Sequence, residues 1–273
     1  NLFLYYVAVP ALIIKFVAQS EIGQIDLKQI ISYFLMQSAC GIFTFLLTSK
    51  YFKRPIPESI IWALTVALSN HVTLLLPITQ IYFSEDVVTQ VASIILMDGV
   101  ILLSLIAFFL ELSTKRNVQL IIFIKNIILN PMILSILIGV FLFVFNFEID
   151  DTPIDYTLST LALCVSPVGL FAIGIILSFH CDNVINKLTI SISFLKLVIS
   201  PLILLLIGYT IFDVSVANKI SGAFFVSVAP CGVTSVVLCS AYNVNPQNII
   251  KAIFISTFLS IGTIFFAIKY LTV

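Results

Sequence analysis

The stretch IIWALTVALSNHVTLLLPITQIYF, residues 60–83, is long enough to cross a lipid bilayer, but it carries Ser69-Asn70-His71 at its centre and then Pro77. A proline inside a helix removes a backbone donor and clashes with the carbonyl four residues earlier. We therefore expect this helix to break at Pro77, where the hydrocarbon offers no water to the freed backbone groups. A second apolar stretch repeats the device with Ala229-Pro230-Cys231-Gly232. Two interrupted spans in corresponding places of two halves are typical of a transporter's binding site.

The composition is that of a membrane protein. Hydrophobic residues make up 60% of the 273 residues and charged residues 10%, and the mean hydropathy is +1.19; soluble domains of ordinary composition are far less apolar. The formal net charge is zero, so nothing indicates a nucleic acid as partner. The five cysteines form no CxxC motif and no cluster with histidine, so we expect neither a disulfide, a metal site nor a cofactor.

Nine apolar windows have about the 20 residues that a helix needs to cross a hydrocarbon core of about 30 Å. The sequence therefore predicts an all-α polytopic membrane protein, with the lipid bilayer as its surroundings. The connectors are short and hold most of the charge, and none is long enough to form a separate domain. The nine predicted spans are residues 2–18, 30–49, 60–83, 88–110, 121–145, 158–179, 189–212, 219–242 and 249–270.

The distribution of basic residues predicts the orientation of the spans. Lysine and arginine in short loops stay on the cytoplasmic side. The loops after the even-numbered spans hold six basic residues, whereas the alternate loops hold Lys28 and Lys219 only. We expect loop 50–59 to be cytoplasmic, the acidic loops 84–87 and 146–157 to be outside, and the membrane to be the inner, or plasma, membrane. The six basic residues are Lys50, Lys53, Arg54, Lys115, Arg116 and Lys187.

The two halves of the chain resemble each other. The prolines of the first and sixth spans, Pro10 and Pro167, correspond, as do Pro77 and Pro230 of the broken spans. Both pairs lie five spans apart, and an odd offset places the two copies in opposite orientations, as in the inverted repeats of secondary carriers. We expect a first repeat over 1–110, a short cytoplasmic connector over 111–120 and a second repeat over 121–273. The fifth span lacks a counterpart, so the simplest account is a ten-span protein of five plus five spans whose first helix is missing here.

A set of short motifs along the chain resembles one family of transporters. Their order and spacing are similar to those of the auxin efflux carrier family, in particular the bacterial permeases related to the plant auxin exporters, and the resemblance covers the whole chain. The chain departs from the family pattern at Leu75, where the family usually has a glycine between the asparagine and the proline. The motifs are Val9-Pro10-Ala11-Leu12-Ile13-Ile14-Lys15, Ser69-Asn70 with Pro77, Asn130-Pro131-Met132-Ile133-Leu134 with Gly139, Pro167 to Leu177, Leu195 to Leu202, and Ala229-Pro230 through Ala241-Tyr242.

The resemblance implies a scaffold domain and a moving domain, with the two broken helices crossing in the moving domain. It also implies secondary active transport of small organic anions, which are carboxylates such as malate or malonate, or auxin-like weak acids. A homodimer is one expected assembly, and a proton or sodium is the expected coupling ion. The ten residues of segment 111–120 leave no room for the long cytoplasmic loop of the plant branch.

The predicted substrate site lies at the middle of the bilayer. Asn70, Pro230 and Asp98 each fall near the midpoint of their predicted span, so they lie at one depth. Broken helices present half-helix N-termini, whose free donors and positive dipole ends suit a carboxylate. Alternatively, the Asn70 side chain could form a structural hydrogen bond between helices. The predicted substrate-binding residues are Ser69, Asn70, Thr73, Pro77, Pro230, Cys231, Gly232, Thr234 and Ser235.

Asp98 and Lys196 are the charged residues placed deepest in their halves. A carboxylate at mid-depth is costly and marks a functional site by default. Two readings stay open: Asp98 couples transport to a proton or another cation, or it forms a structural ion pair with Lys196. His71 has no second histidine nearby, so a structural role is favoured for it, and Lys15, near a span end, is expected to extend toward the interface without a transport role.

Other classes of function fit the sequence less well. An intramembrane protease needs a second catalytic acid or a serine and histidine pair, whereas Asp98 is the only acid at mid-depth, so we expect no enzyme. An anion channel or facilitator without ion coupling would also use polar residues at the midplane and remains the alternative. Flux that saturates and is stimulated by countertransport would distinguish a carrier from a channel.

Overall fold

The structure is a computed structural model, and it describes residues 3–19, 26–114, 131–147, 149–178, 185–212 and 220–272. The described residues form helices and no strand, which confirms an all-α polytopic membrane protein. Four helical segments are long and apolar enough to cross a membrane: Leu27–Tyr51, Glu85–Thr114, Lys187–Ile211 and Gln247–Leu271. Three shorter apolar helices are Tyr6–Gln19, Ile56–Ala67 and Ile133–Val144. Residues 115–130, which include the start of the predicted fifth span, lie outside the described residues.

The helices of the first half run from η1 to α6, and η marks a π-helical turn. They are η1 (Leu4–Ala8), α1 (Val9–Gln19), α2 (Leu27–Leu46), η3 (Leu47–Tyr51), α3 (Ile56–Ala67), η4 (His71–Leu75), α4 (Leu76–Tyr82), α5 (Glu85–Met97), η5 (Asp98–Leu102) and α6 (Leu103–Thr114). Because α6 extends to Thr114, the first four residues of the expected connector are helical.

The second half continues from α8 to α16. Its elements are α8 (Pro131–Val144), α9 (Pro153–Leu163), α10 (Val165–Ser178), α11 (Lys187–Phe194), η6 (Leu195–Ile199), α12 (Ser200–Ile211), α14 (Ser221–Ser227), α15 (Thr234–Ala241) and α16 (Gln247–Thr272). The predicted span 158–179 is thus two helices, α9 and α10, which meet at Cys164, and α9 begins earlier than expected because Thr152 caps it and Pro153 occupies its first turn.

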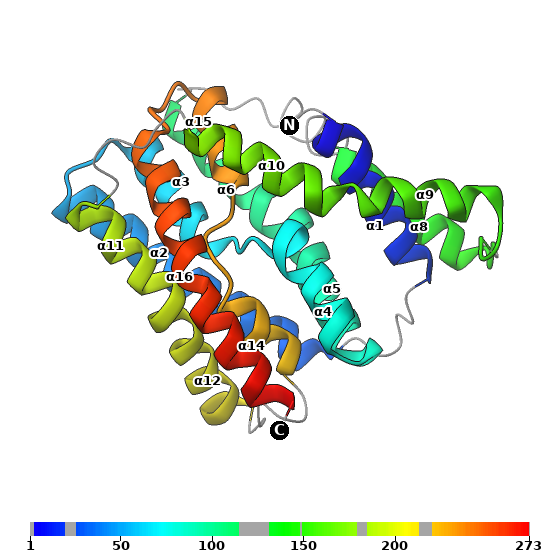
Figure 1. The fold of residues 1–273 in the computed structure, drawn as a ribbon. Coiled ribbons are helices and arrows are strands. Elements are labelled where there is room, and N and C mark those ends of the chain that lie inside the picture. Colours follow the sequence, from blue (N-terminus) through cyan, green and yellow to red (C-terminus); the bar gives the residue numbers. More distant parts are fainter. Residues whose placement is uncertain are drawn as a thin grey trace.

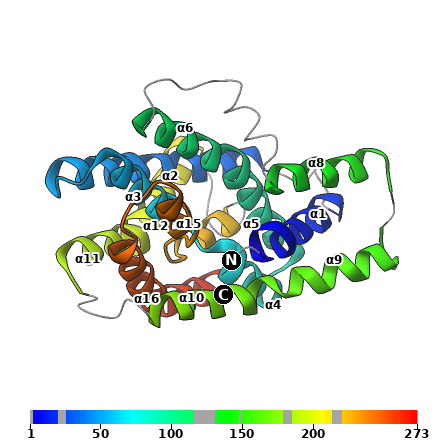
Figure 2. The same cartoon turned by 90° about the horizontal axis from the view of Figure 1, so that it is seen from above.

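The helices pack around two separate apolar cores. A small core of Ala8, Val9, Ile13, Val17 and Val165 joins η1 and α1 to the start of α10. Here α1 packs along α8 and α9, and both views show these three helices together at one side of the molecule (Figure 1, Figure 2). The large core lies among α2 to α6 and α11 to α16. We call η1, α1, α8 and α9, which surround the small core, the small group, and the helices around the large core the large group. Each group contains helices from both halves of the sequence.

Helix α10 connects the two groups. It continues from α9 across the molecule toward α16 (Figure 2) and packs against the broken segment η4. Gly169 makes this approach possible, since a Cβ atom there would lie 2.7 Å from Cγ2 of Thr73. The interface between the groups thus runs directly over the first broken helix.

The outer faces of the large group are apolar and exposed. On α16, Phe258 is 68% exposed and Phe265 70%. Large apolar side chains in such number on a protein surface indicate contact with lipid. The chain is a multi-pass membrane protein.

The ends of the long helices alternate as the predicted topology requires. The turn between α2 and α3 and the start of α11 lie at one end, at the upper left of Figure 1, while the α4–α5 turn and the end of α16 lie at the other. Which of these ends faces the cytoplasm stays a prediction.

Candidate functional site

Two broken helices cross inside the large group. The first consists of α3 and the η4–α4 segment, separated by Leu68–Asn70; the second consists of α14 and α15, separated by 228–233. At the crossing the two extended segments pair as a single antiparallel bridge, Ser69 opposite Cys231. The amide of Asn70 donates to the carbonyl of Pro230 at 3.0 Å, and the amide of Gly232 donates to the carbonyl of Leu68 at 2.7 Å. Each break therefore satisfies backbone groups that the other leaves free.

The first break does not lie at Pro77, and that expectation is wrong. Pro77 lies in the first turn of α4, and the helix already bends out of α geometry at η4, where the π-helical turn accommodates the missing donor. The second break does include its proline, since Pro230 lies in the extended link. What sets the first break is its pairing with the second.

Gly232 permits this close crossing. A Cβ atom at Gly232 would lie 2.8 Å from the carbonyl oxygen of Leu68 and 2.9 Å from its Cγ atom. Atoms cannot approach so closely, so any other residue at this position would push the two crossing segments apart. Cys231 is fully buried beside it, and its amide donates to Oγ of Ser256 on α16 at 3.2 Å.

Ser69 is the centre of a buried hydrogen-bond network. Its hydroxyl donates to the carbonyl of Val226 at 3.0 Å, so it accepts from Tyr33, whose hydroxyl lies 3.0 Å away. It also accepts from Nζ of Lys196 at 2.7 Å. Lys196 is 0% exposed, and its Nζ atom donates further to the carbonyl of Val66 at 2.9 Å. The network joins α2, η6 and both broken helices.

Asp98 forms its contact with His71. Oδ2 of the carboxylate lies 2.9 Å from Nε2 of the imidazole, both residues are buried, and Asp98 is only 1% exposed. Oδ1 of Asp98 has no hydrogen-bond partner among the described residues. Lys196 contacts Val66 and Ser69 instead, so the two residues do not form the ion pair that the sequence left open. His71, assigned a structural role from the sequence, is the missed partner; its position beside Asn70 in a broken helix was the available signal.

Asn70 presents a free donor at the start of the second half-helix. Its Oδ1 atom accepts a hydrogen bond from Thr73 Oγ1, while Nδ2 has no partner among the described residues although the side chain is 97% buried, being 3% exposed. An unsatisfied buried donor is rare in proteins and calls for a reason. A hydrogen-bond acceptor on a bound molecule would satisfy this donor.

The remaining predicted residues lie around the second break. Thr234 begins α15, and Ser235 is buried in its first turn, where its hydroxyl donates to the carbonyl of Gly232 at 2.9 Å. The hydroxyl of Ser235 thus closes the turn that leads out of the crossing. Pro77 lies apart from the crossing, in the wall of a cavity.

That cavity, of about 760 Å³, lies between the two groups of helices. Val72, Leu76 and Pro77 of the first broken helix line one wall, and the opposite wall comes from α1 and α9. The first turn of α5 contributes Glu85 and Asp86. Val72, which directly follows His71 in the chain, is the residue of the cavity wall that is nearest in sequence to the crossing.

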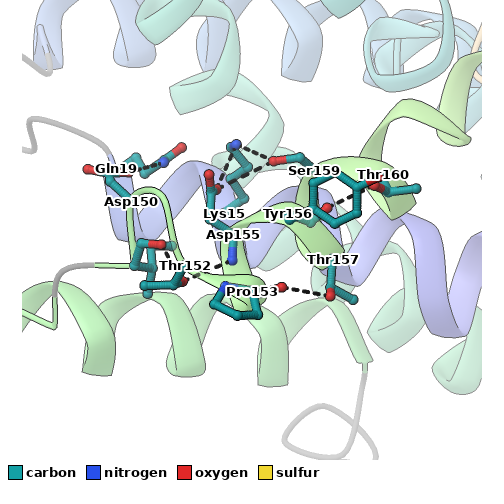
Figure 3. A network of polar contacts seen from close by, with 11 residues as sticks. Lys15, Gln19, Asp150, Thr152, Pro153, Asp155, Tyr156, Thr157, Ser159 and Thr160 are labelled. Carbon is teal, nitrogen blue, oxygen red and sulfur yellow. Dashed lines mark hydrogen bonds and ion pairs between the residues drawn. The ribbon is translucent and has the colours of Figure 1, made fainter.

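Lys15 lies in the wall of this cavity that α1 forms. Figure 3 shows its ammonium held between α9 side chains: it pairs with Asp155 at 2.8 Å and hydrogen-bonds to Ser159. Gln19, one turn later, donates to Asp150 at 2.5 Å (Figure 3). Lys15 therefore joins α1 to α9 and lies in the cavity wall, while its expected position near the membrane interface stays a prediction.

Two crossed broken helices, buried polar groups at the crossing and a cavity between two groups of helices define a polytopic membrane transporter. The family comparison agrees: the family model described as Membrane transport protein matches residues 1–268. The chain therefore belongs to the auxin efflux carrier family of membrane transport proteins, as its motifs suggested. No curated protein matches the chain.

Proposed function

We propose that the protein is a secondary active carrier of small organic anions, such as malate, malonate or another weak carboxylic acid, in the inner (plasma) membrane. The crossing of the two broken helices is the proposed binding site. The observation that carries the proposal is the free Nδ2 donor of Asn70 at the start of the η4–α4 half-helix. A helix N-terminus attracts negative charge, and a hydrogen bond from an amide donor beside it would orient a bound carboxylate.

Transport by alternating access is supported by the two separate cores. The small group, which contains α1, α8 and α9, serves as the scaffold, and the large group carries the crossing and moves against it. The cavity of about 760 Å³ between the groups is the proposed entry route to the crossing in the state described. Among the described helices, α10 packs against η4 and α16, and α8 packs against η5, so these are contacts that such a movement would change.

A proton on the Asp98–His71 pair is the proposed coupling ion. The pair is buried and links η5 to the first broken helix, and Oδ1 of Asp98 makes no hydrogen bond to the described residues. Histidine and carboxylate pairs inside membranes form proton relays in pumps and transporters. Binding of substrate at Asn70 is thereby linked to the neighbouring His71.

The test is an uptake screen in liposomes with labelled mono- and dicarboxylates. A carrier shows saturable uptake that increases when unlabelled substrate is loaded inside. Flux that grows linearly with concentration and does not respond to internal substrate would assign the protein to the alternative class, an anion channel or facilitator. Absence of flux with every carboxylate, in protein shown to be folded by its melting curve, would contradict the proposed substrate class.

A further inference from the structure

Lys196 is placed where two half-helices end. The half-helix α3 ends at Ala67 and α14 ends at Ser227. The ammonium binds the carbonyl of Val66 directly, and it reaches the carbonyl of Val226 through the hydroxyl of Ser69. The last carbonyls of a helix lack partners within the helix and carry its negative dipole end. Two negative ends therefore meet at one lysine side chain.

Among the described residues, no carboxylate forms an ion pair with this ammonium. Asp98 contacts His71 instead. A buried charge without compensation is very costly, so the carbonyl and hydroxyl oxygens at the helix ends must provide the compensation. Such oxygens are also the ligands that carriers built on broken helices offer to a coupling sodium ion, together with half-helix C-terminal ends.

We propose that the ammonium of Lys196 is a tethered cation that takes the place of a sodium ion at the crossing. It holds the C-terminal ends of α3 and α14 together permanently, so the crossing keeps its shape without a dissociable metal cation. The inference rests on the proposed function only in treating the crossing as the substrate site. With the ammonium in place, the crossing needs no sodium ion, and the Asp98–His71 pair remains the proposed site that couples transport to a proton.

Removal of the side chain should turn the position into a sodium site. In Lys196→Ala the carbonyl of Val66 and the hydroxyl of Ser69 lose the ammonium, while Tyr33 keeps its hydrogen bond to Ser69. The space of the lysine side chain becomes free for an ion with its water. Lys196→Gln keeps a hydrogen-bond donor but removes the charge. Lys187→Ala is the matched control, because it removes an exposed lysine from the start of Lys187–Ile211, the continuous helical segment that also contains Lys196.

Thermal unfolding of the purified full chain is measured in sodium chloride and in N-methyl-D-glucamine chloride of equal ionic strength. The unaltered protein and Lys187→Ala should melt at the same temperature in both salts. Lys196→Ala should melt at least about 3 °C higher in sodium chloride, as expected for an ion that binds only the folded state. Lys196→Gln should be less stable than the unaltered protein in N-methyl-D-glucamine.

Three results would overturn the proposal. The first is a melting temperature of the unaltered protein that depends on sodium. The second is a Lys196→Ala variant that melts at the same temperature in both salts, or that fails to fold in both. The third is a Lys196→Gln variant that is as stable as the unaltered protein without sodium. Uptake in liposomes gives the second readout: Lys196→Ala should recover about fivefold in rate when sodium replaces N-methyl-D-glucamine, while the unaltered protein does not respond. The melting experiment needs no substrate, so the difference between the two salts can be interpreted even if the protein does not carry anions.

Discussion

Replacement of Asn70 by alanine should weaken substrate binding without unfolding the protein. The Nδ2 atom makes no hydrogen bond to the described residues, so its loss removes no contact of the empty site. Oδ1 does accept from Thr73, and the loss of one such neutral hydrogen bond costs about 1 kcal/mol of stability. A hydrogen bond to a charged carboxylate is worth about 1.5 to 3 kcal/mol. Affinity should therefore fall roughly ten- to hundredfold.

Two further variants separate the donor from the rest of the side chain. Asn70→Asp keeps the acceptor for Thr73 but replaces the donor with a negative charge, so it should bind an anion even more weakly than Asn70→Ala. Thr73 is itself a predicted substrate-binding residue, but in the structure its hydroxyl donates to Oδ1 of Asn70. Thr73→Val removes this hydrogen bond and keeps the amide donor, so affinity should fall less than in Asn70→Ala.

The assay is calorimetric titration of each purified variant with the best substrate from the liposome screen, together with a melting curve. Equal affinity of Asn70→Ala and the unaltered protein would refute the reasoning and leave Asn70 as a structural residue. A loss of affinity in Thr73→Val as large as that in Asn70→Ala would also refute it, because the shape of the turn rather than the free donor would then decide binding.

Three other predictions concern coupling, the crossing and the topology. Asp98→Asn should retain exchange of substrate between the two sides of a liposome but lose net uptake driven by an imposed pH gradient; gradient-driven uptake at the normal rate would exclude Asp98 as the proton site. Gly232→Ala should lower stability by about 1 to 3 kcal/mol through overpacking, seen as an earlier melting transition, and an unchanged melting curve would contradict the close crossing. In a cysteine-free protein, an impermeant maleimide added to intact cells should label a cysteine at Asp150 and spare one at Lys50, and the reverse pattern would invert the topology.

The class of protein and the pairing of its two breaks could be predicted from the sequence because both leave local signals. Long apolar windows follow from the thickness of the bilayer, and a proline in each of two such windows indicated which spans are interrupted. The place of the first break could not be predicted in this way. Pro77 fits into the start of a helix, whereas Leu68–Asn70 is held extended by hydrogen bonds to Pro230 and Gly232, which are distant in sequence.

The partner of Asp98 could not be predicted for a related reason. Spacing along a span predicts the depth of a residue in the bilayer, and both Asp98 and Lys196 are buried inside the structure. Depth says nothing about the direction in which a side chain points around the helix bundle. The π-helical turns that begin at Asp98 and Leu195 turn the two helices locally, and the carboxylate meets His71 while the ammonium meets Ser69.

The polarity of the crossing gives a physical reason for a carrier of anions. The C-terminal ends of α3 and α14 are already occupied by the Lys196 ammonium, directly or through Ser69. The ends that remain available are the starts of the η4–α4 segment and of α15, at Asn70 and Thr234, and these are the positive ends of their half-helices. A cation at the crossing would face either a site filled by lysine or the positive ends of two helices. A carboxylate would find an unused amide donor and two favourable dipoles, so this polarity supports the proposed anionic substrate whatever the substrate's shape.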